Sequence, residues 1–441
     1  MHLLIHDYAG HPFEAQLSRE LAQRGHQVTH AYAGNLLTPR GALQLKPDDA
    51  PTLDFVEVPM AEAYRANKYS FLKRRGYELA YGTELASLVT RLQPDLVISG
   101  NTPSEPQWTM IQAARRLKLP VISWVQDFYS VAVDKLARKK LPVIGALAGA
   151  WYRHMDGNCF RASAAIIAIT EDFLPILDGF GVPPGRVTVI PNWAPLDELP
   201  VLPRVNAWSA RQGLNDKFVF HYSGTLAMKH NPDLLRQLAA RFREDAAIRV
   251  VVISEGPGAD YLKKVKVRDH LENLLILPFQ PFADLPEILA AADVLLAVLE
   301  ADAGVFSVPS KVLSYHCAGR PILAAMPARN LASRILKQAG SGYCVEPDDS
   351  AGFIEQAASL RNDSWQRDQC GQAARVYAET RFAIGTIASR FETLFNKVIS
   401  TARITKPRRW LPGNLLPLNQ PAAGCPAGQP ADFVRAKISN K

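Results

Sequence analysis

Short runs of apolar residues alternate with longer stretches of helical periodicity along most of the chain. In the first half, the apolar runs lie at 2–6, 27–32, 53–58, 95–99, 120–125, 165–169 and 187–190. They are apolar throughout rather than at every second position, which is typical of strands buried on both faces of a parallel sheet. Amphipathic helices are predicted between them, at 13–24, 77–92, 105–117 and 171–178. The pattern predicts a doubly wound α/β domain.

The same pattern begins again after a proline-rich interruption. The segment 191–203 carries four prolines and has no regular period, so we interpret it as a linker. Further apolar runs follow at 218–223, 248–254, 273–278, 293–299, 321–326 and 342–347. We therefore expect two Rossmann-like domains, at 1–195 and 196–380. Two such domains place a ligand cleft between the carboxyl ends of their strands.

The chain is expected to end in a helix and a tail. Helical periodicity runs from about 380 to 399, and we expect the segment 381–400 to pack back on the N-terminal domain. Residues 401–441 are rich in proline and glycine, which predicts a disordered tail.

Composition narrows the class of protein only slightly. A net charge of +8 suits an anionic ligand, a phospholipid surface or nucleic acid. Nucleic acid is disfavoured because the basic residues form no single stripe interleaved with aromatic residues. The five cysteines are scattered without metal-binding spacing, which favours reduced thiols and a cytoplasmic location. The most apolar stretch, 142–151, is about half the length that a membrane-spanning helix needs.

Two lysines in the second half are candidates for binding phosphate. Lys229 follows the small residues Gly224 and Thr225 at the end of a predicted strand. Lys311 follows Pro309, which we expect to start a helix, and free N–H groups at a helix start bind anions. If both loops face one cleft, the two lysines form a diphosphate site without a metal motif. Two unrelated surface lysines are the alternative.

Two further loops are candidates for contacting a nucleotide base. The turn at 255–258 follows a strand but is not a G-x-G-x-x-G motif, and no acidic residue lies at the spacing that would take a ribose. A dehydrogenase is therefore disfavoured. In the loop at 278–281, Phe279 could stack on a base, although a buried phenylalanine in a connecting loop is the better explanation from this segment alone.

Taken together, these motifs resemble those of bacterial family 4 glycosyltransferases with the GT-B fold. The resemblance covers roughly residues 1 to 395. It is densest in "YSGTLAMKHNPDLL", in "VPSKVLSYHCAGRPILA" and in "GYCVEPDD", and looser in "WVQDFY" and "IPNWAP". It implies an enzyme that transfers a sugar from a nucleotide sugar, UDP-linked by expectation, with retention of anomeric configuration. It implies no cofactor and no essential metal.

The resemblance also assigns roles to individual residues. It implies catalytic roles for Lys229, Lys311 and Asp127. The residues that it places at the donor diphosphate and sugar are Gly10, Gly224, Thr225, Lys229, Gly304, Val305, Phe306, Ser310 and Lys311. Those that it places at the base and ribose are Glu255, Gly256, Phe279, Gln280 and Ser314.

The sequence departs from the family pattern at three places. Many relatives carry two glutamates eight residues apart where this chain has Phe306 and Ser314. A serine binds a ribose hydroxyl more weakly than a carboxylate does. Gly10 stands alone where relatives often have two glycines. Asp127 replaces a frequent catalytic histidine, and it would serve equally as a cap for the following helix.

The resemblance implies a polyprenyl-diphosphate-linked saccharide as acceptor, and with it a peripheral position on the cytoplasmic face of the inner membrane. The segment 135–155 contains no acidic residue and fits an anionic interface. A core helix with a basic end is the alternative. The expected membrane contacts are Lys135, Arg138, Lys139, Lys140 and Trp151.

Two other functions remain open from the sequence. A non-hydrolysing sugar-nucleotide epimerase would share the fold and the diphosphate site. A non-catalytic scaffold that binds nucleotide sugar would explain the missing glutamates. No nucleic-acid partner is expected.

Overall fold

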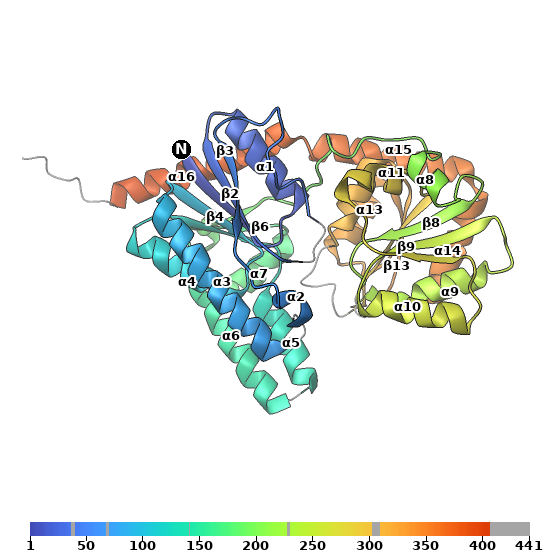
Figure 1. Cartoon of the computed structure of the whole chain (residues 1–441), viewed down its shortest axis with the longest axis horizontal. Coiled ribbons are helices and arrows are strands. Elements are labelled where there is room, and N and C mark those ends of the chain that lie inside the picture. The colour runs from blue at the N-terminus through green and yellow to red at the C-terminus, as the bar shows by residue number, and fades with distance from the viewer. Residues whose placement is uncertain (37–39, 68–69, 141, 227–229, 302–308, 406–441) are drawn as a thin grey trace, which may run out of the picture.

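Two α/β domains lie side by side in the computed structural model (Figure 1). It describes residues 1–36, 40–67, 70–140, 142–226, 230–301 and 309–405. Each domain is built on a parallel sheet with helices on both faces. This is the α/β architecture that the apolar runs predict.

The N-terminal sheet has seven parallel strands in the order β3-β2-β1-β4-β5-β6-β7. The order reverses between β1 and β4, and ligand sites form at such a point, beyond the carboxyl ends of the strands. The strands are β1 (His2–Asp7), β2 (Gln27–Ala33), β3 (Leu53–Val58), β4 (Leu96–Gly100), β5 (Val121–Val125), β6 (Ala165–Ala168) and β7 (Val187–Val189). Their helices are α1 (Pro12–Gln23), α2 (Tyr64–Asn67), α3 (Phe71–Leu92), α4 (Ser104–Arg116), α5 (Tyr129–Lys140), α6 (Pro142–Ala162), η1 (Glu171–Phe173), α7 (Leu174–Gly179) and η2 (Pro184–Arg186).

The second sheet has six parallel strands in the order β10-β9-β8-β11-β12-β13. Its order reverses between β8 and β11. The strands are β8 (Phe218–Ser223), β9 (Ile248–Ile253), β10 (Leu274–Leu277), β11 (Val294–Val298), β12 (Ile322–Ala325) and β13 (Gly342–Val345). Its helices are α8 (Ala207–Arg211), α9 (Pro232–Arg241), α10 (Pro257–Arg268), η4 (Phe282–Asp284), α11 (Leu285–Ala290), α12 (Lys311–Ala318), α13 (Leu331–Ala339), α14 (Ser350–Asn362) and α15 (Ser364–Arg381).

The last described helix, α16 (Ile384–Thr405), leaves the second domain and packs on the first. Its Phe391 ring lies 4.9 Å from the ring of Trp124 and 6.0 Å from that of Trp193, centroid to centroid. At the helix surface, Arg24 Nη1 donates to Glu392 Oε2 at 2.8 Å. One helix of the C-terminal segment therefore completes the core of the N-terminal domain.

The predicted bounds of this last helix are wrong at both ends. Helix α15 continues to Arg381, and α16 begins only at Ile384, because the buried Phe382 turns the chain between them. Helix α16 then runs through residues 401–405, which we predicted as tail. The first proline of the C-terminal segment comes only at residue 407, so nothing in the sequence before it stops the helix. Residues 406–441 lie outside the described residues.

The basic segment 135–155 spans two helices rather than one. Helix α5 ends at Lys140 and α6 begins at Pro142, and the two pack as an antiparallel hairpin that extends away from the sheet (Figure 1). Proline is favoured at the first position of a helix and disfavoured in its interior, which accounts for the break. Among the described residues, no helix combines the length and apolar character needed to cross a membrane.

Candidate functional site

Lys311 opens helix α12 at the carboxyl edge of the second sheet. Its Nζ atom lies 3.5 Å from the centroid of the Tyr222 ring, at the end of β8. Nζ is covered from solvent and has no hydrogen-bond partner among the described residues. Burial lowers the pKa of the Lys311 ammonium well below its ordinary value. The Lys311 Nζ atom is thus desolvated, with an aromatic ring on one side and no anion beside it among the described residues.

The start of α12 differs by two residues from the prediction. The helix begins at Lys311 with Ser310 before it, so Pro309 is not its first residue. The Val312 N–H donates to the Pro309 carbonyl at 3.2 Å, and the Leu313 N–H donates to the Ser310 carbonyl at 3.0 Å. These short-range bonds form a tight turn ahead of the helix, and they place Lys311 on its first turn.

The loop after β8 is fixed by hydrogen bonds from neighbouring elements. Tyr315 of α12 accepts from the Ser223 N–H at 3.0 Å, and the Tyr222 hydroxyl donates to the Thr225 carbonyl at 2.7 Å. Gly224 has a φ of +121°, and a Cβ there would lie 3.4 Å from Lys311 Nζ. Gly224 therefore permits both the backbone turn and the close approach of the lysine.

The two loops that we expected at the base contact each other. The Phe279 N–H donates to Glu255 Oε1 at 3.3 Å, which joins the ends of β9 and β10. Gly256 has a φ of +98° and precedes α10, a conformation that favours glycine. Gln280 Nε2 donates to the Pro278 carbonyl at 2.9 Å, so this amide supports its own loop.

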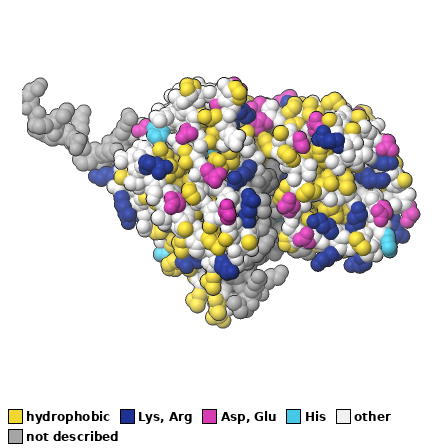
Figure 2. Space-filling view, viewed as in Figure 1, with side chains coloured by type: hydrophobic (Ala, Val, Ile, Leu, Met, Phe, Trp, Pro, Cys, Tyr) yellow, Lys and Arg dark blue, Asp and Glu magenta, His cyan; other side chains and the backbone are white. Residues whose placement is uncertain are grey.

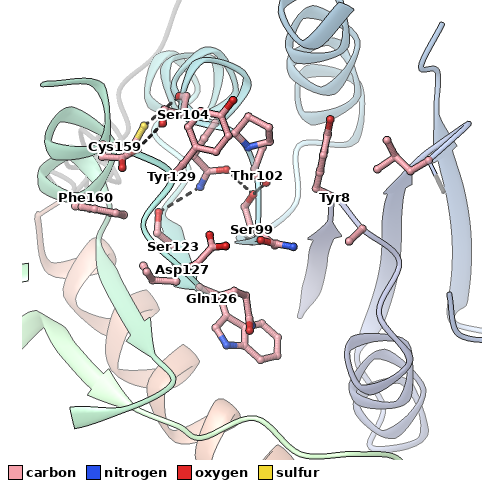
Figure 3. Close-up of a pocket in the computed structure, with 18 of the residues that line it drawn as sticks. Tyr8, Ser99, Thr102, Ser104, Ser123, Gln126, Asp127, Tyr129, Cys159 and Phe160 are labelled. Atoms are coloured by element: carbon pink, nitrogen blue, oxygen red, sulfur yellow. Dashed lines mark hydrogen bonds between the residues drawn. The ribbon is translucent and has the colours of Figure 1, made fainter. Parts of the chain in front are cut away.

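A pocket of about 530 Å³ lies at the carboxyl ends of β1, β4 and β5 in the first domain. Asp127 lines it, as does Thr225 from the second domain, so the pocket faces the cleft between the domains. Figure 3 shows Tyr8 on one side of this pocket and Ser123, Gln126 and Asp127 on the other. The structure therefore brings Asp127 and Thr225, two of the predicted residues, to one cavity.

A buried hydrogen-bond network forms the floor of this pocket. The Ser99 hydroxyl, labelled in Figure 3, donates to Gln107 Oε1 at 2.7 Å. It also lies 2.8 Å from His6 Nδ1. His6 Nε2 lies 2.6 Å from the Tyr81 hydroxyl. Burial lowers the pKa of His6 to about 3, so the ring is neutral. It therefore donates to Ser99 through Nδ1 and accepts from Tyr81 through Nε2, which leaves every member of the network satisfied.

Other pocket residues were missed by the sequence analysis. Arg74 pairs with Glu78 at 2.7 Å and lies over the Tyr129 ring, with its guanidinium carbon 5.6 Å from the ring centroid. Asp156 accepts from the Ser104 hydroxyl and from a backbone N–H, and burial raises its pKa. Arg74 and Asp156 come from α3 and α6, where no motif was recognised, whereas Tyr129 is the last residue of the quoted segment "WVQDFY".

Gly10 has a conformational reason to be glycine. Its φ is +78°, and a Cβ there would lie 2.8 Å from Leu43 Cδ1. Its neighbour His11 belongs to a cluster with Asp7 and Glu14, whose metal-ligating atoms all lie within 4.8 Å of one another. These are the residues of the described chain whose spacing could hold a metal ion.

Several predicted residues cannot be placed. Lys229, Gly304, Val305 and Phe306 lie outside the described residues, as do the side chains of Lys135, Lys139 and Lys140. Ser310 is exposed and Ser314 is half-buried, on the same face of α12 as Lys311.

Two family models match consecutive parts of the chain. "Glycosyltransferase Family 4" matches residues 15–198, and "Glycosyl transferases group 1" matches residues 205–377. The boundary between them falls next to the proline-rich linker.

Individual relatives agree with these matches. A probable glycosyltransferase of Pseudomonas aeruginosa, WbjE, is 25% identical over 313 residues, which are 67% of this chain and 74% of that protein. Among solved structures, HepE of Anabaena in complex with UDP and glucose has a TM-score of 0.65 at 14% identity, over 89% of this chain and 99% of that one. Sucrose-phosphate synthase of Thermosynechococcus elongatus has a TM-score of 0.67 at 12% identity, over 91% of this chain and 100% of that one.

Proposed function

This chain belongs to the family 4 glycosyltransferases of the GT-B fold. We propose that it transfers a sugar from a UDP-sugar to a lipid-linked saccharide, with retention of the anomeric configuration. The product would serve cell-surface polysaccharide biosynthesis. The observation that carries this proposal is the buried Nζ atom of Lys311 at the carboxyl edge of the second sheet, which has no partner among the residues that the structure describes.

The donor diphosphate is the anion that this ammonium lacks. A lysine without a partner in a desolvated position binds a multiply charged oxyanion strongly, because the attraction is little screened there. Lys229, on the preceding loop, would supply a second positive charge. HepE binds UDP on a similar fold, which supports a uridine nucleotide as the donor.

Charge neutralisation would also drive the reaction. Negative charge grows on the β-phosphate as the bond to the sugar breaks. A preorganised cation therefore stabilises the transition state more than the bound donor. On this mechanism the protein needs no metal, because the lysines take the role that a divalent cation has in other phosphate sites.

The pocket in the first domain is proposed to bind the acceptor. Aromatic faces and neutral hydroxyls line it, including Tyr8, Tyr129 and Ser99, a combination that suits a sugar ring. Asp127 would contact the attacking hydroxyl or the donor sugar, since it lines the same cavity as Thr225 of the donor domain.

The α5–α6 hairpin is proposed to contact the membrane. Four large apolar side chains on the first turns of α6 are exposed, Val143 by 76%, Ile144 by 64%, Leu147 by 69% and Trp151 by 52%. Their spacing of three and four residues places them along one side of the helix. Figure 2 shows apolar side chains gathered at the tip of this hairpin.

Basic residues next to this apolar stripe favour an anionic surface. Arg138 and Arg153 are more than half exposed and share a single carboxylate, that of Asp134. Such a surface would hold the protein on the cytoplasmic face of the inner membrane, where a polyprenyl-linked acceptor is embedded.

The test is transfer itself. The purified protein is incubated with radiolabelled UDP-glucose, UDP-galactose or UDP-N-acetylglucosamine and with undecaprenyl-diphosphate-linked saccharide, and the anomeric configuration of the product is read by NMR. A retained linkage is expected. Conversion of the UDP-sugar without acceptor would instead identify an epimerase, and UDP binding without transfer would identify a scaffold. Either outcome would overturn the proposal.

A further inference from the structure

An open groove of about 510 Å³ runs along helix α6 and shares no lining residue with the interdomain pocket. This basic groove is lined by the polar side chains of Arg138, Arg153, His154 and Arg161. Among the residues that the structure describes, no acidic side chain lines it. A cavity with such a lining suits a ligand that carries negative charge.

The basic groove and the interdomain pocket lie on opposite faces of α6. Asp156 and Cys159 line the interdomain pocket, whereas His154 and Arg161 line the basic groove. The helical period places these two pairs on different sides of the helix. A ligand in the basic groove is therefore not the acceptor that we place in the interdomain pocket.

One amide holds two of the groove residues in place. Arg161 Nη2 donates to Asn158 Oδ1 at 2.9 Å, and Asn158 Nδ2 lies 3.0 Å from His154 Nε2. Because the amide nitrogen donates, Nε2 accepts, and a neutral His154 ring carries its proton on Nδ1. This Nδ1–H has no partner among the described residues and is available to a ligand. Arg161 Nη1 also donates to the Phe180 carbonyl at 2.8 Å, which ties α6 to the loop after α7.

The other two arginines of the groove share one carboxylate. Arg138 Nε donates to Asp134 Oδ1 at 2.7 Å, whereas Arg153 Nη2 lies 3.7 Å from Asp134 Oδ2. Their side chains are 53% and 62% exposed, so most of their N–H groups are accessible. One carboxylate does not neutralise two guanidinium groups, and the groove lining keeps a positive charge. Guanidinium groups bind phosphate oxygens through paired N–H donors.

The basic groove continues the exposed apolar face of the same helix. Leu147 and Trp151 precede His154 by seven and three residues, spacings that keep the three side chains on one side of α6. A helix rises about 1.5 Å per residue, so His154 lies about 10 Å from Leu147 along the axis. An amphipathic helix buries its apolar face about 5–10 Å into the boundary between headgroups and acyl chains. With Leu147 at that depth, the groove lies at the level of the lipid phosphates.

We propose that the basic groove binds the phosphate of one anionic phospholipid, whose acyl chains run along the apolar face of α6. Arg138, Arg153 and Arg161 neutralise the phosphate, and His154 donates to it through Nδ1. This inference rests on the membrane contact in the proposed function and deepens it. A site for one lipid takes the place of a diffuse attraction to a charged surface, and the sugar-transfer site takes no part in it.

Short-chain lipids test the groove without a membrane. Monomeric dihexanoyl-phosphatidylglycerol, below its critical micelle concentration, should bind to the full-length protein at one molecule per chain in calorimetry. Dihexanoyl-phosphatidylcholine carries its own cation beside the phosphate and should bind at least about 10-fold more weakly. Inorganic phosphate should also bind at least about 10-fold more weakly, because it cannot bury apolar surface against α6. Equal affinity for either of these two ligands would overturn the proposal.

The central variant combines Arg153→Gln with Arg161→Gln. Glutamine keeps a polar side chain and removes both charges, so affinity for dihexanoyl-phosphatidylglycerol should fall at least about 10-fold. The control combines Arg115→Gln with Arg116→Gln, which removes two exposed arginines from the last turn of α4 in the same domain. The control has the same net charge as the central variant and should bind the lipid as the wild type does. Equal loss of binding in both would show that only net charge matters and would overturn the proposal.

NMR tests the groove without any substitution. The imidazole signals of His154 in the wild-type protein should shift on addition of dihexanoyl-phosphatidylglycerol. Unshifted signals at a saturating concentration of this lipid would overturn the proposal. Tighter binding of farnesyl diphosphate than of the phospholipid would assign the groove to a prenyl diphosphate and would also overturn it.

These outcomes separate the inference from the proposed enzymatic function, because none of the measurements involves sugar transfer. Failure of the lipid titration would overturn the phospholipid site and leave transfer from a UDP-sugar standing. Absence of transfer, with one phospholipid bound per chain, would overturn the proposed reaction and support the site.

Discussion

The ammonium of Lys311 lies 3.5 Å above the ring of Tyr222, and no anion among the described residues neutralises it. The two residues are 89 positions apart in the sequence (311 − 222) and come from two elements that meet at the switch point of the second sheet. The ring compensates part of the desolvation of the charge. An oxyanion that enters the cleft can therefore bind to Lys311, and the first two predictions follow from this.

Replacing Lys311 by methionine should abolish transfer without unfolding the protein. Methionine keeps the length of the apolar stem and removes a buried amine that has no partner among the described residues, so thermal unfolding should occur at an unchanged or higher temperature. Turnover should fall by about 10²-fold or more. Lys263→Met on α10, with a side chain 61% exposed, is the control and should keep full activity. Near-normal turnover of Lys311→Met would contradict the diphosphate assignment.

UDP binding should be coupled to proton uptake. Burial holds the pKa of Lys311 low in the free protein, and a bound diphosphate would raise it. Between those two pKa values binding takes up a proton, so UDP affinity should decrease as the pH rises. Calorimetry in buffers of different ionisation enthalpy measures this directly above about pH 7.5, where the terminal phosphate of UDP (pKa about 6) is already ionised. The uptake should vanish in Lys311→Met.

Polar substitutions on α6 should release the protein from anionic vesicles. The triple variant Val143→Ser, Ile144→Ser and Leu147→Ser removes three exposed apolar side chains, each worth about 1.5–3 kcal/mol if buried in the interface. Sedimentation with phosphatidylglycerol vesicles should show at least about 10-fold weaker binding. The control is Val267→Ser on α10, where the valine is also 76% exposed. Equal loss in both variants would argue against a specific membrane face.

Phe391→Ala should destabilise the N-terminal domain although the residue lies near the C-terminus. Phe391 is fully buried and packs edge-on against the stacked rings of Trp124 and Trp193, so the truncation should cost about 3–5 kcal/mol of unfolding free energy. Denaturant titration followed by tryptophan fluorescence measures it. Val376→Ala on α15, where the valine is 60% exposed, should change stability by less than about 0.5 kcal/mol.

The fold was largely predictable because each strand is encoded locally. A run such as 248–254 is apolar at nearly every position, and only a strand covered on both faces uses such a run. Helix ends were less predictable. The start of α6 follows from the proline at residue 142, which the apolar period does not register, whereas the turn at Phe382 depends on how the helices pack.

The candidate site was predictable only where its residues share a short segment. Lys311, Ser310 and Ser314 lie within five residues, and helix geometry places them on one face. The pairing of His6 with Tyr81 joins residues far apart in sequence, so no local pattern could reveal it. The spacing of Asp7, His11 and Glu14 at intervals of four and three was visible in the sequence. We did not predict the cluster, because Asp7 ends a strand whereas His11 and Glu14 lie at the start of a helix.

The position of Phe391 also has a consequence for the order in which the molecule is made. A ribosome completes the strands of the first sheet long before it reaches residue 391, yet the side of Trp124 and Trp193 that Phe391 contacts stays uncovered until α16 emerges. The nascent N-terminal domain therefore keeps part of its apolar surface exposed to solvent while the ribosome synthesises the second domain. A chaperone that binds apolar surface could bind the nascent domain during that interval, and it would be released when α16 packs on the sheet.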